Sequence, residues 1–205
     1  NNMSPKILLI IFLLSVSLNE ILARIGEERL QLEQRLNISG GFQYREENVL
    51  SNRKRGMPYQ KYLDYLPDRT EIRIYYKTLD GRKPLAKEIK ASGMLEGWDV
   101  HVIYVEGKSV LEIYRRSSSI NEFEFAALLR LQTGQSFWEK RQTGGENETP
   151  ITAFGFDYER NDKKLRAKKM GANTLLICST PFDQFLKKQF QEEQMESLPA
   201  SIKGF

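Results

Sequence analysis

The segment from Trp98 to Arg116 constrains the fold of this chain most, because its apolar side chains follow the pattern of two paired strands. Apolar and aromatic residues occupy both faces of residues 98–105 and of residues 110–114. The polar triplet Glu106-Gly107-Lys108 separates the two stretches and suits a tight turn. The segment therefore predicts an antiparallel hairpin with two well-buried strands.

Other regions show the period-two alternation that is typical of strands. Residues 70–78 alternate and lead into Asp80-Gly81, which predicts a strand that runs into a hairpin turn. Residues 154–158 alternate again. Residues 165–170 and 174–180 predict a further hairpin.

Two helices are predicted from apolar spacing and from the residues at their ends. Residues 27–36 form a short amphipathic stretch that Gly40-Gly41 ends. The second helix opens at Ser119, which has the spacing of a capping box with Glu122, and Gly134 ends it.

A third helix has the strongest start signal in the chain. Thr180 is the expected cap, Pro181 takes the first helical position, and Asp183 completes the box. The polar, basic tract from Gln43 to Gly56, in contrast, predicts an exposed loop.

The order of these elements favours an α+β fold, because helices and antiparallel hairpins are segregated along the chain. We predict an N-terminal signal helix over residues 1–23, which is cleaved. A first unit of one helix and antiparallel strands is expected over residues 24–116. A second such unit, with the C-terminal helix, is expected over residues 117–205.

The N-terminus predicts export. Lys6 is followed by a largely apolar run from Ile7 to Leu18, the order of charges and apolar residues in a secretory signal peptide. The run is shorter than the roughly 20 residues that a membrane-spanning helix needs. We therefore expect cleavage after Ala23, a secreted or periplasmic protein, and no membrane span in residues 24–205.

The chain has one histidine, His101, and one cysteine, Cys178. A single cysteine cannot form a disulfide within the chain, so stability must come from an ordinary hydrophobic core, in which a buried, inert Cys178 is expected. His101 lies in a strand of alternating apolar residues, where a structural histidine is favoured over one in a catalytic triad. One histidine and one cysteine cannot supply the three or four ligands of a usual zinc site. We predict no catalytic, cofactor-binding or metal-binding residues, although hydrolysis by a carboxylate pair stays open.

Two groups of side chains are candidates for an interaction surface. They are the aromatic residues Tyr59, Tyr62 and Tyr65 and the basic residues Lys164, Arg166 and Lys168. Tyrosine often anchors protein interfaces, and packing under the long loop is the alternative. The basic residues would share one face of a strand and bind anionic groups, and a solvated face is the alternative. Nucleic acid is not favoured as a partner, because the net charge is only +4 and acids and bases are interspersed.

The region after the predicted cleavage site resembles the opening of small uncharacterised secreted bacterial proteins. The residues that carry this resemblance are Arg24-Ile25-Gly26-Glu27, Leu30, Leu32, Leu36, Gly40, Gly107-Lys108-Ser109-Val110 and Tyr114-Arg115-Arg116. More distantly, residues 26–40 resemble the helical entry of the SmpA/OmlA envelope lipoproteins and of the related beta-lactamase-inhibitor-protein fold. Known members of that fold bind other proteins, so the resemblance implies a fold and a binding role. The lipobox cysteine of the lipoproteins is absent before Cys178.

Two functions remain open at this point. The first is an exported, non-enzymatic module that binds another envelope or secreted protein, and the missing catalytic constellations favour it. The second is a secreted hydrolase that uses acidic residues. A cleft with two adjacent carboxylates, one of them with a raised pKa, would favour the hydrolase.

The predicted signal peptide has a direct test. Mass spectrometry of the exported protein should find a mature N-terminus at Arg24 or within a few residues of it, because Ala23 suits the cleavage pocket. If protein extracted from membranes still begins at Met3, the first methionine of the chain, the apolar run is an anchor and is not a cleaved signal.

Overall fold

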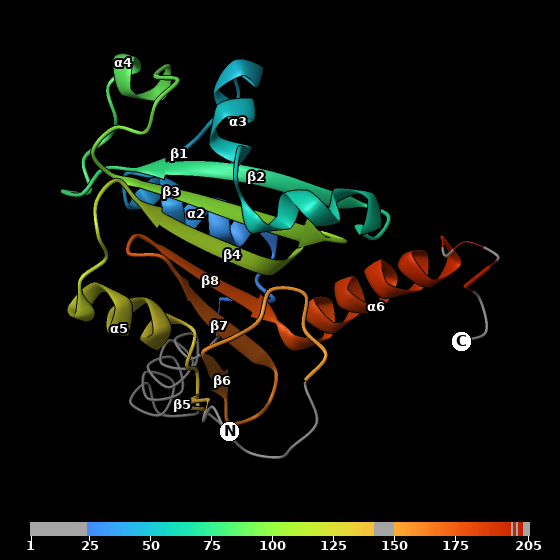
Figure 1. Ribbon diagram of the computed structural model, residues 1–205. Helices are drawn as coiled ribbons and strands as arrows, with labels where there is room; N and C mark the ends of the chain where they lie inside the picture. The colour runs from blue at the N-terminus through green and yellow to red at the C-terminus, as the bar shows by residue number, and fades with distance from the viewer. Residues whose placement is uncertain (1–23, 142–149, 198, 200, 203–205) are drawn as a thin grey trace, which may run out of the picture.

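The computed structural model describes residues 24–141, 150–197, 199 and 201–202 (Figure 1). The predicted signal peptide, residues 1–23, lies outside the described residues. Eight strands form one antiparallel sheet, and helices pack against it. The fold is therefore α+β, as the sequence predicts. No helix in the described residues has the length and apolar character needed to cross a bilayer.

The sheet is built in two sets of four strands. The strands are β1 (Phe42–Gln43), β2 (Thr70–Lys77), β3 (Trp98–Val105), β4 (Lys108–Arg116), β5 (Trp138–Lys140), β6 (Tyr158–Arg160), β7 (Leu165–Met170) and β8 (Thr174–Ser179). The helices are α2 (Arg29–Ile38), α3 (Glu47–Lys54), α4 (Ala86–Ile89), α5 (Glu122–Leu131), α6 (Thr180–Glu196) and the 3-10 helix η1 (Pro58–Tyr65). The strand order is β1-β2-β3-β4-β8-β7-β6-β5, so the two sets meet where β4 pairs with β8.

Both hairpins predicted around long apolar strands are confirmed. β3 pairs with β4 through a two-residue turn at Glu106-Gly107. Both turn residues have positive φ, 51° and 82°, as a type I′ hairpin turn requires. β7 and β8 form the second hairpin, from Leu165 opposite Ser179 to Met170 opposite Thr174.

The hairpin predicted at Asp80-Gly81 is wrong, although the strand before it is present as β2. β2 pairs with β3 through a long connection, residues 78–97, that contains α4. Gly81 packs against Gly40, two residues beyond the last residue of α2. A Cβ on Gly40, whose φ is +81°, would lie 2.1 Å from the carbonyl oxygen of Gly81. This contact directs the chain onto α2, not straight back along the sheet.

Helices cover both faces of the sheet. On one face, Leu32 of α2 and Phe125 and Leu129 of α5 are buried against the strands. On the other face, η1 and α6 supply buried aromatic and aliphatic side chains, and α3 packs against β2. Figure 1 shows α2 behind β3 and β4, and α6 extending away from the sheet toward the C-terminus. Residues on both faces of the central strands are therefore shielded from water.

The exposed loop predicted for residues 43–56 is wrong, because this tract contains α3. Val49 is buried beside Tyr44 and Ile74, and Arg53 is buried as well. Val49 and Leu50 are adjacent and are the only apolar residues of α3, so they give little helical periodicity and the pattern in the sequence resembles a solvated loop. Tertiary packing, not an amphipathic stripe, stabilises the helix.

Two helix starts differ from the predicted positions. Asn121, not Ser119, caps α5: its side chain accepts a hydrogen bond from the Glu124 backbone N–H, and Glu124 bonds back to the cap. The cap of α6 is Ser179, one residue before the predicted Thr180.

The strand predicted over residues 154–158 begins only at Tyr158. Phe154 lies in the preceding loop and is buried against η1 and α6. Its apolar character reflects this contact with the helices, and it takes no place in the sheet.

The cap of α5 allows a paired stability test. Asn121→Ala should lower the free energy of unfolding by about 1 kcal/mol, because it removes the acceptor for a free backbone N–H. Ser119→Ala should leave it nearly unchanged, because Ser119 lies outside the helix. Urea denaturation of both variants measures the difference, and equal losses would contradict the assigned cap.

Candidate functional site

The tyrosines proposed as an interaction surface lie mainly in the interior. Tyr59 and Tyr62 are 0% and 2% exposed. The Tyr59 hydroxyl lies 2.9 Å from His101 Nδ1, and the Tyr62 hydroxyl donates to the carbonyl oxygen of Ala153. Tyr65 is half-buried and donates to Glu193 of α6. Tyr59 and Tyr62 are therefore not part of an exposed interaction surface. The short helix η1 directs both side chains toward the sheet, where they pack in the core.

The basic residues of the same prediction do not share one solvated face. Lys164 is exposed, but Arg166 is only 5% exposed. Arg166 donates to Glu159 Oε1 at 3.0 Å and to Asp183 Oδ2 at 2.8 Å. Its face of β7 is covered by the start of α6, so Arg166 is removed from the predicted surface. Lys168 is half-buried and its Nζ donates to the carbonyl oxygen of Phe154.

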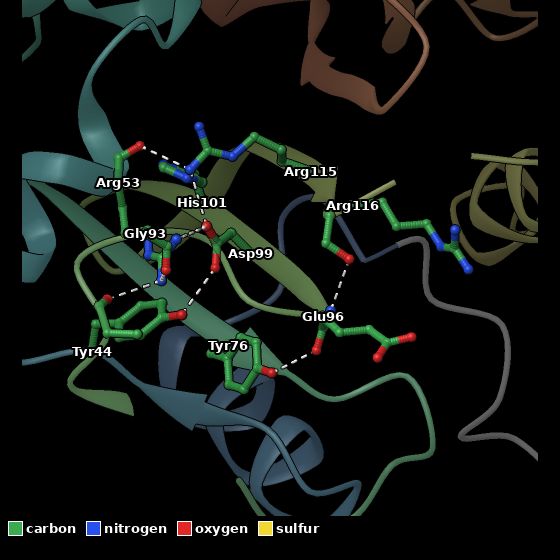
Figure 2. Close-up of polar contacts among 12 residues, drawn as sticks. Tyr44, Arg53, Tyr76, Gly93, Glu96, Asp99, His101, Arg115 and Arg116 are labelled. Atoms are coloured by element: carbon green, nitrogen blue, oxygen red, sulfur yellow. Dashed lines mark hydrogen bonds and ion pairs between the residues drawn. The ribbon is translucent and has the colours of Figure 1, made fainter. Parts of the chain in front are cut away.

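A buried carboxylate on β3 organises one polar cluster. Asp99 is 0% exposed and accepts from the Tyr44 hydroxyl at 3.1 Å and from Arg115 Nη2 at 3.0 Å (Figure 2). Arg53 Nη1 lies 3.6 Å from the same carboxylate. Two guanidinium groups thus face one carboxylate, which compensates the cost of burying it.

Arg53 extends this cluster to the long connection between β2 and β3. Its Nη2 donates to the carbonyl oxygens of Ala91 and Gly93 at 3.2 and 2.7 Å. In the same region the Tyr76 hydroxyl donates to the carbonyl oxygen of Glu96 (Figure 2). The cluster therefore fixes α3 and residues 91–96 to the sheet, which is a structural role.

His101 lies two residues along β3 from Asp99 and is 0% exposed. Burial, and then the positive charges of Arg115 and Arg53, lower the pKa of His101 to about 3. The ring is therefore neutral at physiological pH and has no access to a substrate. The complete burial of His101 agrees with the structural histidine that the sequence favours, and the packing of η1 over that face of the sheet explains it.

Cys178 on β8 is 0% exposed, and burial raises the pKa of its thiol well above the usual value. A buried thiol with a raised pKa carries little reactive thiolate. The prediction of an inert, structural cysteine is consistent with this environment.

A second buried acid, Glu112 of β4, lies among the α2 and α5 contacts. It is 1% exposed and accepts from the Tyr114 hydroxyl and from Gln132 Nε2 through Oε2, while its Oε1 has no partner among the described residues. Burial raises the pKa of Glu112, although the hydrogen bond from Tyr114 and the charge of Arg35 act in the opposite direction.

Glu112 has the raised pKa of a general acid but not its surroundings. The charge of Glu27 contributes to the raised pKa, so this carboxylate lies nearby. Glu27 is paired with Arg35 at 2.6 Å, and Glu112 itself is shielded from solvent. The burial of Asp99 and Glu112 was not predicted from the sequence. An acid between apolar residues of a predicted strand, as in Leu111-Glu112-Ile113, is the pattern that could have indicated it.

Two hollows open on the surface around Lys168. The first has a volume of about 440 Å³, and its lining includes Lys140, Arg141, Lys168, Lys169 and Phe156. The second, of about 420 Å³, is also lined by Lys168. These hollows bring together basic residues from the end of β5, from β7 and from η1. Of these residues, only Lys168 belongs to the basic surface predicted from the sequence.

The second hollow is formed largely by the start of η1 and by the loop before β6. Its lining residues are Gly56, Met57, Pro58, Gln60, Lys61, Ala153, Phe154, Lys168 and Met170. Lys61 lies with its Nζ 4.7 Å from the centroid of the Tyr62 ring. Lys168 therefore stands between a hollow that contains Arg141 and one that contains Lys61.

Within the described ranges, no group of three or more histidine, cysteine, aspartate or glutamate side chains is placed to hold a metal ion. Comparisons of the chain with protein-family models, with curated proteins and with solved structures find no match. The resemblance to secreted bacterial proteins and to the SmpA/OmlA lipoproteins therefore stays a prediction.

The raised pKa of Glu112 predicts a pH-dependent stability difference. The folded pKa lies above the unfolded value near 4.5, so the stabilisation of the protonated form is complete at low pH and is lost as pH rises toward the folded pKa. As pH rises across that window, the free energy of unfolding of Glu112→Gln should increase relative to that of the wild type by up to about 1.4 kcal/mol per pH unit. Urea denaturation between acid and neutral pH measures it.

Glu71→Gln is the matched control for that experiment. The hydrogen bond from Arg73 lowers the pKa of Glu71, so its contribution is present above the unfolded pKa and lost as pH falls. The difference in free energy of unfolding between variant and wild type should therefore rise with pH for Glu112→Gln and fall with pH for Glu71→Gln. A Glu112→Gln variant that follows the wild type at every pH would show that the carboxyl is ionised in the folded protein.

Proposed function

We propose that this chain is an exported, non-enzymatic module that binds another protein. The observation that carries the proposal is where the reactive groups lie. His101, Cys178 and Glu112 are each at most 1% exposed, so a substrate cannot reach them in this fold. The hollows around Lys168, in contrast, open to solvent and present charged side chains to a partner.

Export is the second part of the proposal and rests on the sequence. The basic and apolar order of residues 1–23 supports a secretory signal, and the protein would then act outside the cytoplasm or in the periplasm. An exported protein without an internal disulfide depends on its packed core. The many fully buried side chains of the central strands suit this requirement.

A hydrolase that uses acidic residues is the second candidate, and the raised pKa of Glu112 favours it. Two contacts argue against it. Gln132 covers the Glu112 carboxyl, and the nearby Glu27 is held in an ion pair with Arg35. A hydrolase would need this region to open before a substrate could contact either acid.

Affinity capture with the tagged, exported protein tests the proposed function. An envelope or secreted fraction from the producing cells should yield one protein partner whose capture saturates with bait concentration. His101→Gln and Cys178→Ala should retain that partner, because both side chains are buried away from the surface. The cysteine change should cost only about 1 kcal/mol of stability.

The opposite result is equally specific. Repeated failure to capture a saturable partner, together with a measurable hydrolytic turnover that Glu112→Gln abolishes in a folded protein, would replace the binding module by the hydrolase.

A further inference from the structure

We propose that the two hollows beside Lys168 bind an extended acidic segment of the partner protein. The inference rests on the proposed function and adds the chemistry of the partner. Carboxylates of the segment would pair with the basic side chains that line the hollows, which are Lys61, Lys140, Arg141, Lys168 and Lys169.

The charges in these hollows are not compensated by described carboxylates. Several cations elsewhere on the sheet are paired with acids, such as Arg73 with Glu33 and Arg160 with Asp162. The five basic residues of the hollows form no ion pair with a described acid. Asp157 lies in the lining of the first hollow, where it accepts from the Lys169 backbone N–H at 2.9 Å. The described lining of the two hollows therefore carries more positive than negative side chains, and an acidic ligand would neutralise this excess.

Aromatic and backbone contacts hold these cations in place without cancelling their charge. The Arg141 guanidinium lies 4.9 Å from the centroid of Phe156, and Lys169 Nζ lies 5.4 Å from that of Phe125. Lys168 Nζ is 2.8 Å from the carbonyl oxygen of Phe154. Side chains that are already ordered lose less entropy when a ligand binds.

The arrangement of the hollows favours an elongated ligand over a single anion. The two hollows, of about 440 and 420 Å³, share Lys168 as a wall. A peptide that crosses Lys168 would place acidic residues near Arg141 on one side and near Lys61 on the other. One small anion would contact only one of these groups.

Two features favour an acidic peptide over a nucleic acid. Stacking of bases needs a free aromatic face, and the Phe156 ring is covered by the guanidinium groups of Arg141 and Arg166, at 4.9 and 4.5 Å. The whole chain has a net charge of only +4, whereas phosphate binding over several nucleotides uses a broader basic surface.

Fluorescence anisotropy with the exported protein tests the inference. The probe is a labelled peptide of alternating Glu and Gly, and its Gln counterpart is the neutral control peptide. The Glu peptide should bind. The triple variant Lys140→Gln, Arg141→Gln and Lys169→Gln should weaken binding about tenfold, since it removes three of the five positive charges in the lining of the hollows. Higher salt should weaken binding to the wild type.

The double variant Lys164→Gln and Lys188→Gln is the control for a general effect of positive charge. Both residues are exposed lysines outside the lining of the two hollows. This variant should bind the Glu peptide as the wild type does. Circular dichroism should show that both variants remain folded.

Each contrary outcome overturns a stated part of the inference. Equal loss in the triple and double variants would reduce the interaction to general charge. Binding of heparin or of anionic lipid vesicles without binding of the Glu peptide would replace the acidic segment by another anion. If affinity capture still retains the partner on the triple variant, the proposed site is wrong and the proposed function stands. If the Glu peptide binds but no partner is captured, the site stands and the proposed function is wrong.

Discussion

The pairing of β4 with β8 is the interaction on which the rest of the structure depends, because it joins four strands from each half of the chain into one sheet. Leu111 lies opposite Cys178, and Ile113 lies opposite Leu176. All four side chains are fully buried. This apolar seam supplies the long-range connection that a disulfide often provides in small exported domains. The single cysteine contributes to it by packing and not by a covalent bond.

A sheet covered on both faces must accommodate any acid in its central strands, and this chain does so in two ways. Asp99 remains beside two guanidinium groups, so its negative charge is matched. Glu112 has one hydroxyl and one amide donor, and burial favours its neutral form. The first arrangement fixes α3 and the long connection to the sheet. The second leads us to expect a pH-dependent stability without exposure of the carboxyl.

The sequence predicted those parts of the fold that local patterns determine. Long apolar alternation was sufficient for the β3–β4 and β7–β8 hairpins. It was insufficient for α3, whose buried residues include Arg53, because an arginine is read as exposed unless its distant partner Asp99 is known. The same reason applies to the site: Arg166 was assigned to a surface because Asp183 is remote in sequence. The hollows beside Lys168 combine residues from η1, β7 and the end of β5, and the spacing of these residues along the chain does not predict that they lie close together.

The outermost strands of the sheet are short, with two residues in β1 and three in β5. An edge of this length exposes few unpaired backbone N–H and carbonyl groups, so it offers little template for another strand. Lateral growth of the sheet is therefore disfavoured at the β5 end, where β5 pairs with the whole of β6, whereas β1 pairs with only Tyr75 and Tyr76 of the eight-residue β2. The shortness of β5 limits recognition by strand addition at that edge, because main-chain hydrogen bonds supply most of the affinity in that mode of binding. At the β5 edge we therefore expect the proposed partner to be recognised through its side chains more than through its backbone.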